Sequence, residues 1–213
     1  MMLLNCVSDS LFKSTSSKSN SSDNSEILFE AVNQTVFPLV FATLSKECDL
    51  SEYQSQYFNI IGKNIKVFEE HKLLHKLMSE NGVRYVFLKG CASARYYSDP
   101  LLRTMGDVDV LISSEDTQKV DQLLISAGYV KYADSDNDDT HIGYKSRNGV
   151  VCELHRQING IPKNKIGERI SKLFSDIFEK AILENGEYLC PSNFHHGLIL
   201  LLHTATHLTN EGV

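Results

Sequence analysis

The chain has 213 residues, of which 42% are hydrophobic and 23% charged, and its formal net charge is −6. This composition is typical of a soluble globular protein with one good core, and the negative charge argues against a general nucleic-acid binder. The five cysteines form no CxxC pair, and no apolar run reaches the ~20 residues that span a bilayer. The N-terminus also lacks a basic segment typical of a signal peptide. We therefore expect a soluble, cytoplasmic protein without a membrane partner.

The N-terminal third divides into a polar segment and a helical segment. Residues 8–25 are mostly Ser, Asn, Lys and Asp, which predicts a disordered Ser-rich tail over residues 1–25. Helical spacing follows over residues 26–45, where Pro38 should end or kink the pattern, and again over residues 51–80 up to Asn81-Gly82. We assign residues 26–82 to N-terminal helices that pack against a sheet. The buried stripe expected in the second helix consists of Ile61, Ile65, Phe68, Leu73, Leu74 and Leu77.

Two β-prone runs then carry the charged residues of greatest interest. Residues 83–89 predict a strand that ends at Lys89-Gly90 and turns into a short helix, a geometry that can bind phosphate. Residues 107–112 predict a second strand, in which Asp107 and Asp109 point to the same face. Two adjacent carboxylates repel each other unless a divalent cation such as Mg²⁺ lies between them. This pattern indicates phosphoryl or nucleotidyl chemistry, with Lys89 and Arg103 as nearby cations.

A predicted hairpin places a third acidic group in an apolar strand. Residues 141–146 and 150–158 flank Arg147-Asn148-Gly149, and Val151, Glu153 and His155 share one face of the second strand. A half-exposed strand also carries a polar residue by chance, so the residues alone leave the role of Glu153 open. The acidic run at 134–139 lacks the glycine and closing Glu of a calcium loop, and we interpret it as a solvated loop.

The C-terminal region, residues 161–213, reads as helical. Residues 162–183 have helical spacing, and a further helix is expected to begin at Pro191. His203 and His207 are four residues apart and could bind zinc, but the sequence lacks the Glu of an HExxH site. We favour packed or hydrogen-bonded histidines for this cluster, which also includes His195 and His196.

Taken together, several motifs resemble one known family. Leu88-Lys89-Gly90, Arg103 and Gly106-Asp107-Val108-Asp109-Val110-Leu111 resemble the LKG…R…GDxDxL pattern of the uncharacterised nucleotidyltransferase family, within the polymerase-beta-type superfamily. Glu153-Leu154-His155 resembles its D/E-L-H, which supplies the third carboxylate, and residues 203–207 resemble its H-x-x-x-H. The resemblance implies an α+β fold, with a small mixed sheet as a nucleotidyltransferase core over residues 83–160 and helices packed around it. Because relatives continue beyond the H-x-x-x-H, it also implies that the C-terminal helical region is truncated.

The resemblance further implies a site and a reaction. Asp107, Asp109 and Glu153 would be the catalytic carboxylates and would hold two Mg²⁺ ions, with Mn²⁺ as an alternative. Lys89, Gly90, Ser93 and Arg103 would bind the nucleoside triphosphate, such as ATP, with Ser93 supplying the hydroxyl that Gly90-Cys91 lacks. The acceptor would be a protein, a sugar or a small molecule. Two other interpretations stay open: an inactive nucleotide-binding regulator, and a helical interaction module on the same fold.

Overall fold

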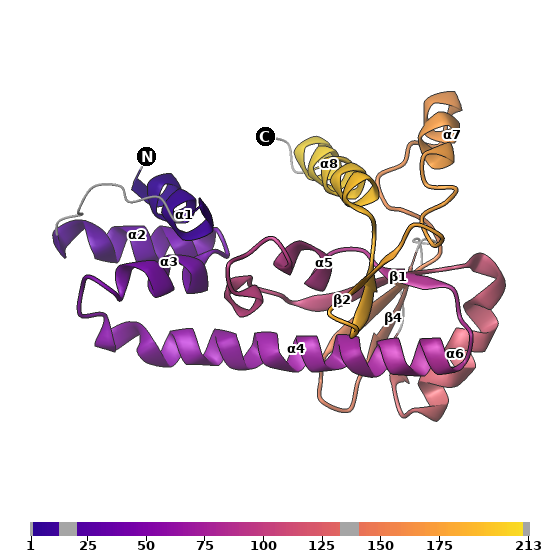
Figure 1. Ribbon diagram of the computed structural model, residues 1–213, viewed down its shortest axis with the longest axis horizontal. Coiled ribbons are helices and arrows are strands. Elements are labelled where there is room, and N and C mark those ends of the chain that lie inside the picture. Colours follow the sequence, from indigo (N-terminus) through magenta and orange to yellow (C-terminus); the bar gives the residue numbers. More distant parts are fainter. Residues whose placement is uncertain (1, 13–20, 133–140, 211–213) are drawn as a thin grey trace. The chain divides into compact units, whose positions relative to one another are not determined.

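The computed structural model describes residues 2–12, 21–132 and 141–210, and these fold into two compact units (Figure 1). The first unit comprises residues 1–68 and 93–106, and the second comprises residues 69–92 and 107–213. The second unit contains a five-stranded mixed sheet with helices, which confirms the predicted α+β class. The acidic run at 134–139 lies outside the described residues.

The first unit is helical and begins earlier than the sequence predicts. Helices α1 (Met2–Phe12), α2 (Ser21–Asn33) and α3 (Phe37–Leu44) precede a short 3₁₀ turn, η1 (Ser51–Tyr53). The expected disordered tail over residues 1–25 is therefore wrong where the chain is described, and residues 13–20 lie outside that part. Leu3 explains the difference, because it is buried in an apolar core with Leu28 and Phe37. Pro38 lies in the first turn of α3, where its missing N–H costs no hydrogen bond. The boundary between α2 and α3 therefore lies before Pro38, and Pro38 does not end a helix.

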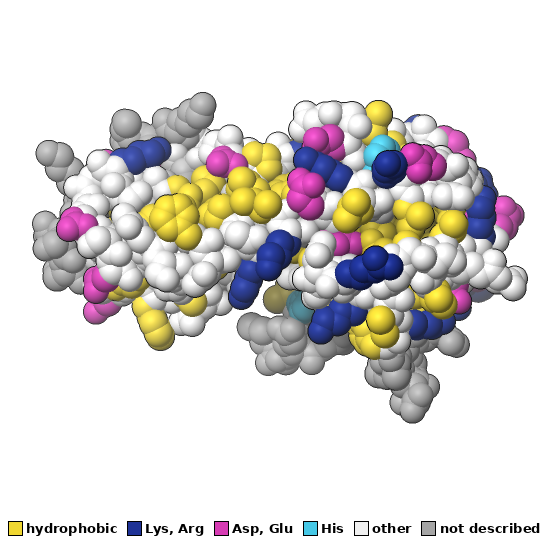
Figure 2. All heavy atoms as spheres, turned by 90° about the horizontal axis from the view of Figure 1, so that it is seen from below, with side chains coloured by type: hydrophobic (Ala, Val, Ile, Leu, Met, Phe, Trp, Pro, Cys, Tyr) yellow, Lys and Arg dark blue, Asp and Glu magenta, His cyan; other side chains and the backbone are white. Residues whose placement is uncertain are grey.

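Helix α4 (Gln54–Glu80) is a single long helix whose buried side matches the predicted stripe only in part: Phe68 and Leu74 are buried, as predicted. Ile65 and Leu73 are 45% and 52% exposed, and Figure 2 shows hydrophobic side chains at the surface on the side of the molecule that α4 faces. Polar groups are buried in their place: the Asn64 side chain donates to the Leu101 carbonyl and accepts from the Met105 N–H. A buried amide is stable when both of its ends are paired, which hydrophobic spacing alone does not reveal. The buried positions of the helix mostly follow a three–four spacing and are Asn64, Val67, Phe68, Glu70, His71, Leu74 and Met78.

The sheet of the second unit has the order β1-β2-β5-β4-β3. Its strands are β1 (Tyr85–Phe87), β2 (Asp107–Ile112), β3 (Val130–Lys131), β4 (His141–Lys145) and β5 (Val151–His155). Strands β2 and β5 are parallel neighbours at the centre, and every other pair is antiparallel. The β4–β5 hairpin predicted around Arg147–Gly149 is present. The parallel β2–β5 pair matters most for function, because it joins two strands that are separated by about forty residues of chain.

Helices cover both faces of this sheet (Figure 1). On one face, Tyr144 of β4 donates to Asp121 of α6 (Thr117–Ser126), and the His71 ring of α4 lies edge-on to Phe87. On the other face, Leu111 and Val86 pack with Ile199 of α8 (Asn193–Asn210). Leu111 and Asp109 are two residues apart in one strand, so α8 packs on the face that carries the aspartates.

The chain between the sheet and α8 is less helical than its spacing suggests. Only α7 (Lys165–Lys172) forms within residues 162–183, and Asn164 caps it by accepting from the Ile166 and Gly167 N–H groups. A two-stranded hairpin, β6 (Ile182–Glu184) with β7 (Tyr188–Cys190), follows and was not predicted. Its turn has Asn185 and Gly186 at positive φ, a pairing typical of a tight hairpin turn. This Asn-Gly signal was present in the sequence.

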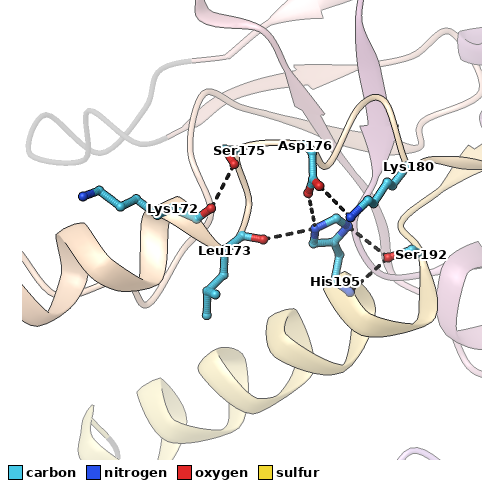
Figure 3. A network of polar contacts seen from close by, with 7 residues as sticks. All are labelled: Lys172, Leu173, Ser175, Asp176, Lys180, Ser192 and His195. Carbon is cyan, nitrogen blue, oxygen red and sulfur yellow. Dashed lines mark hydrogen bonds and ion pairs between the residues drawn. The ribbon is translucent and has the colours of Figure 1, made fainter.

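A polar network holds the start of α8 in place (Figure 3). His195 is 1% exposed, and its Nε2 lies 3.1 Å from the Leu173 carbonyl oxygen and 3.1 Å from Asp176 Oδ1. A carbonyl cannot donate, so Nε2 carries a proton, and Nδ1 is hydrogen-bonded with Ser192 Oγ at 3.0 Å. Ser192 Oγ also accepts from the His195 N–H, as an N-cap does. The network therefore fixes α8 to the segment after α7 and serves a structural purpose.

Among the helices of the described ranges, none is long and apolar enough to cross a lipid bilayer.

Candidate active site

The three predicted carboxylates come from the parallel pair of strands at the centre of the sheet. In the register of β2 and β5, Asp109 is paired with Glu153, and Asp107 lies two residues earlier on the same face. Asp109 is 4% exposed, whereas the Glu153 side chain is 26% exposed. The site therefore has one buried carboxylate, flanked by two that are open enough to meet a ligand.

Lys89 and Gly90 lie at the edge of the same site. The Leu88 N–H donates to the Asp109 carbonyl, which extends the β1–β2 pairing and delivers Lys89 to the carboxylates. Lys89 Nζ lies 3.2 Å from Asp109 Oδ2. Gly90 has φ +49°, and a Cβ there would lie 3.2 Å from His71 Nε2, so the turn requires glycine. The helix that follows, α5 (Cys91–Ala94), is a single turn, so its dipole contributes little at this position.

The two aspartates have opposite electrostatic environments. Burial raises the pKa of Asp107, and the negative charges of Asp109 and Glu153 raise it further. Burial also acts to raise the pKa of Asp109, but the hydrogen bond from His155 and the charge of Lys89 outweigh it, so that pKa is lowered. Asp109 is thus held ionised at neutral pH. The ionised form of Asp107, in contrast, is disfavoured by the negative charges of Asp109 and Glu153.

His155 belongs to this cluster, although it is not among the site residues that we predicted from the sequence. It is 1% exposed, with Nε2 2.8 Å from Asp109 Oδ1 and 3.6 Å from Glu153 Oε2. The signal was available, because strand alternation places Glu153 and His155 on one face, and both belong to the Glu-Leu-His motif.

Ser93 and Arg103 fall in the other compact unit. Arg103 is half-buried, and its Nη1 donates to the neighbouring Thr104 carbonyl at 3.2 Å. Lys89, Gly90 and the three carboxylates share one unit. The assignment of Lys89, Gly90, Ser93 and Arg103 to nucleotide binding stays a prediction.

The histidines of α8 divide into buried and exposed residues. His195 and His196 are each 1% exposed, in agreement with the packed interpretation, whereas His207 is exposed and its ring contacts the ring of His203 edge-on. His203 is half-buried, and burial and the positive charge of Lys89 lower its pKa while Asp109 acts to raise it. The middle of α8 thus places the His203 imidazole close enough to Lys89 and Asp109 for their charges to act on its pKa.

The donor atoms of the cluster fit a divalent cation. One ligand atom from each of Asp109, Glu153 and His155 lies within 4.8 Å of the other two. No other group of three such side chains in the described ranges meets this spacing, so His203 and His207 form no zinc cluster there. Carboxylate oxygens suit Mg²⁺ and Mn²⁺, and imidazole suits the softer metals. The face of the sheet that carries Asp107, Asp109 and Glu153 is therefore a candidate metal centre beside a glycine turn.

Comparison with known proteins agrees with the family resemblance. A family described as an uncharacterised nucleotidyltransferase matches residues 20–213, and the chain belongs to this family. No curated protein matches the chain. Among solved structures, it is similar to LnuA, a lincosamide antibiotic adenylyltransferase with lincomycin bound. The identity is 19%, the match covers 66% of this chain and 89% of that one, and the TM-score is 0.45, which is too low to bear on the acceptor.

Because the two aspartates have opposite electrostatic environments, we predict that replacing each with Asn has opposite effects on the free energy of unfolding. The measurement is made in EDTA so that no metal is bound. Because the pKa of Asp107 is raised on folding, its ionised form opposes folding at neutral pH, and Asp107→Asn should stabilise the protein by up to about 1 kcal/mol. The difference should vanish at acidic pH, where the carboxyl is protonated in both states. The pKa of Asp109 is lowered, so its contribution is present at neutral pH and is lost as pH falls through the folded-state pKa. Asp109→Asn should therefore destabilise the protein by about 1–3 kcal/mol at pH 7.

Urea unfolding of both variants and the unmodified protein at pH 7 and at about pH 3, below the ordinary Asp pKa of 3.8, measures these differences. A less stable Asp107→Asn variant at pH 7 in EDTA would contradict the assignment of repulsion to that residue.

Proposed function

We propose that the protein is a divalent-metal-dependent nucleotidyltransferase. It would move a nucleoside monophosphate from a nucleoside triphosphate, such as ATP, to a hydroxyl group of a protein, a sugar or a small molecule, and would release pyrophosphate. The observation that carries the proposal is the pairing of Asp109 with Glu153 in the β2–β5 register, with Asp107 on the same face and the Lys89-Gly90 turn beside them. Membership of the nucleotidyltransferase family supports the same reaction class.

The chain's own residues have distinct roles in this reaction. Asp107, Asp109 and Glu153 would hold the cations, two Mg²⁺ or alternatively Mn²⁺, which polarise the phosphates and favour ionisation of the acceptor hydroxyl. The Gly90 turn and Lys89 would bind the phosphates beyond the α-phosphorus and offset their charge. Ser93 and Arg103 would add contacts to the nucleotide.

The reaction requires alignment more than covalent help from the protein. The acceptor oxygen would form a bond to the α-phosphorus while the bond from that phosphorus to the bridging oxygen of pyrophosphate breaks, and the hydroxyl proton would pass to water. The family resemblance implies that Glu153 would lie nearest the acceptor, and its 26% exposed side chain fits that place, whereas Asp109 is buried. We place this activity in the cytoplasm, where triphosphates and reduced cysteines occur together.

Transfer of labelled nucleotide tests the proposal. The protein would be incubated with each of four α-³²P-labelled nucleoside triphosphates, Mg²⁺ or Mn²⁺, and fractionated lysate, and label would be followed on protein and small molecules. We expect one labelled product that depends on metal and on Glu153. Triphosphate binding without transfer in any fraction would indicate an inactive regulator instead, and absence of triphosphate binding would leave an interaction module.

Lys89 should link the metal site to the phosphates. Its Nζ lies 3.2 Å from Asp109 Oδ2, so its charge opposes cation binding until the ammonium moves to the triphosphate. Lys89→Met should therefore bind Mn²⁺ several-fold more tightly without nucleotide, and should raise KM for the triphosphate about tenfold.

Lys131→Met is the matched control, because Lys131 forms an ion pair with Asp121 at 3.3 Å on a different part of the sheet. Calorimetric titration with Mn²⁺ measures the first effect and initial-rate kinetics the second. Weaker Mn²⁺ binding by Lys89→Met would be opposite to this expectation.

A further inference from the structure

The buried imidazole of His155 points at two of the carboxylates. We propose that Nε2 of His155 is a direct ligand of the divalent cation, together with Asp109 and Glu153, and that this nitrogen gives the site a preference for Mn²⁺ over Mg²⁺. The inference rests on the proposed cation site and goes beyond it, because a nucleotidyl-transfer site made of carboxylates alone has only oxygen ligands and suits Mg²⁺.

The distances between donor atoms fit a shared ion. Ligand atoms about 2.1 Å from one ion lie about 3 Å apart when they are neighbours in its coordination shell and about 4.2 Å apart when they are opposite. His155 Nε2 lies 2.8 Å from Asp109 Oδ1 and 3.6 Å from Glu153 Oε2. One nitrogen is thus within neighbouring-ligand range of two different carboxylates. A simple hydrogen bond to Asp109 would account for only the first of these contacts.

Burial restricts how His155 can satisfy its polar atoms. The residue is 1% exposed, and its Nδ1 has no hydrogen-bond partner among the described residues. Nε2, in contrast, lies within reach of both Asp109 Oδ1 and Glu153 Oε2. A cation between these three atoms would use both contacts that Nε2 makes.

A nitrogen ligand changes which metal the site prefers. Mg²⁺ strongly favours oxygen ligands and keeps several waters, whereas imidazole is a good ligand for first-row transition metals. Lys89 also reduces the charge available to a purely electrostatic Mg²⁺ site, because it forms an ion pair with Asp109. The charge of Lys89 should weaken the binding of an ion less when that ion also bonds to the neutral nitrogen of an imidazole. Mn²⁺ suits both the carboxylates and the histidine.

Electron spin-echo spectroscopy of Mn²⁺ bound to the full chain tests the proposal without any need for turnover. The protein would be loaded with Mn²⁺ in the presence of a non-hydrolysable triphosphate. We expect ¹⁴N modulation of the Mn²⁺ echo, and its replacement by the ¹⁵N pattern when only histidine is ¹⁵N-labelled. His155→Gln should lose the nitrogen signal and bind Mn²⁺ about 10–100-fold more weakly. It should also lose much of the preference for Mn²⁺ over Mg²⁺ in competition titrations.

His203→Gln is the matched control, because His203 is the α8 histidine whose pKa responds to Asp109 and Lys89. It should keep the nitrogen signal. The isotope exchange in the unmodified protein keeps the test decisive even if His155→Gln does not fold.

Three results would overturn the inference. Bound Mn²⁺ without histidine nitrogen coupling would make His155 a positioning residue that only orients Asp109, and would leave the proposed function intact. Loss of the signal in His203→Gln with retention in His155→Gln would assign the ligand to α8. No Mn²⁺ binding at millimolar concentration, with or without triphosphate, would remove both this inference and the proposed function.

Discussion

Asp109→Asn is expected to reduce nucleotidyl transfer by about 10³-fold or more, which is the largest effect we predict for a single side chain. Asparagine keeps the size of the side chain but removes the charge that holds a cation. It also loses the ion pair with Lys89 at 3.2 Å. The loss should appear in kcat with either metal, and a binding assay should show weaker Mn²⁺ affinity in the same variant.

The matched control for this variant is Glu115→Gln, which removes an acidic group whose side chain is 82% exposed and lies outside the cluster. It should have unchanged kcat. The unfolding measurement at pH 7 described above shows how much of any activity loss reflects unfolded protein. Transfer by Asp109→Asn within tenfold of the unmodified rate, with the protein folded, would mean that Asp109 is not part of the chemistry.

The second large effect concerns stability. Leu154→Ala should lower the free energy of unfolding by about 2–5 kcal/mol, because Leu154 is 1% exposed at the centre of the sheet. It is paired with Val110 of β2 and with Ile142 of β4, so the cavity would be enclosed by three strands. For a chain of this size, the melting temperature should fall by about 5–15 °C.

Leu154→Ala should lower the stability of the protein without changing the rate of transfer by the molecules that remain folded. Leu154 points to the face opposite Glu153, so at low temperature the folded fraction should keep its rate of transfer. Val130→Ala on β3 is the control, because that side chain is 67% exposed and its removal should change stability by less than about 0.5 kcal/mol. A Leu154→Ala variant as stable as the unmodified protein would show that the β5 strand is not packed as described.

Local patterns predicted much of the sheet and which of the aspartates share one face. Alternation in a strand places Asp107 and Asp109 on one face, and the Asn148-Gly149 turn predicts the hairpin that presents Glu153. The parallel pairing of β2 with β5 could not come from periodicity, because it joins segments about forty residues apart and depends on tertiary packing. The family resemblance supplied the expectation that the third carboxylate meets the other two.

The errors have specific physical causes. Residues 1–25 were expected to be disordered on composition, but Leu3 contributes to an apolar core with residues far along the chain. In α4, Asn64 and His71 are buried through hydrogen bonding and ring contact, while Ile65 and Leu73 are exposed. A scale that counts only apolar residues therefore predicts the burial of Phe68 and Leu74 correctly but misses the polar part of the buried side. Strand alternation already places His155 on the face of Glu153, but the contacts that make it part of the site depend on its distances to Asp109 and Glu153, which the sequence does not supply.

The position of a bound cation tests the central claim most directly. Crystals soaked with Mn²⁺ and a non-hydrolysable nucleoside triphosphate would be measured near the manganese absorption edge, where anomalous scattering locates the ion. We expect an anomalous peak within bonding distance of Asp109 and Glu153, with the triphosphate extending toward Lys89 and Gly90. A triphosphate bound elsewhere, or a manganese peak that touches none of Asp107, Asp109 and Glu153, would contradict the account.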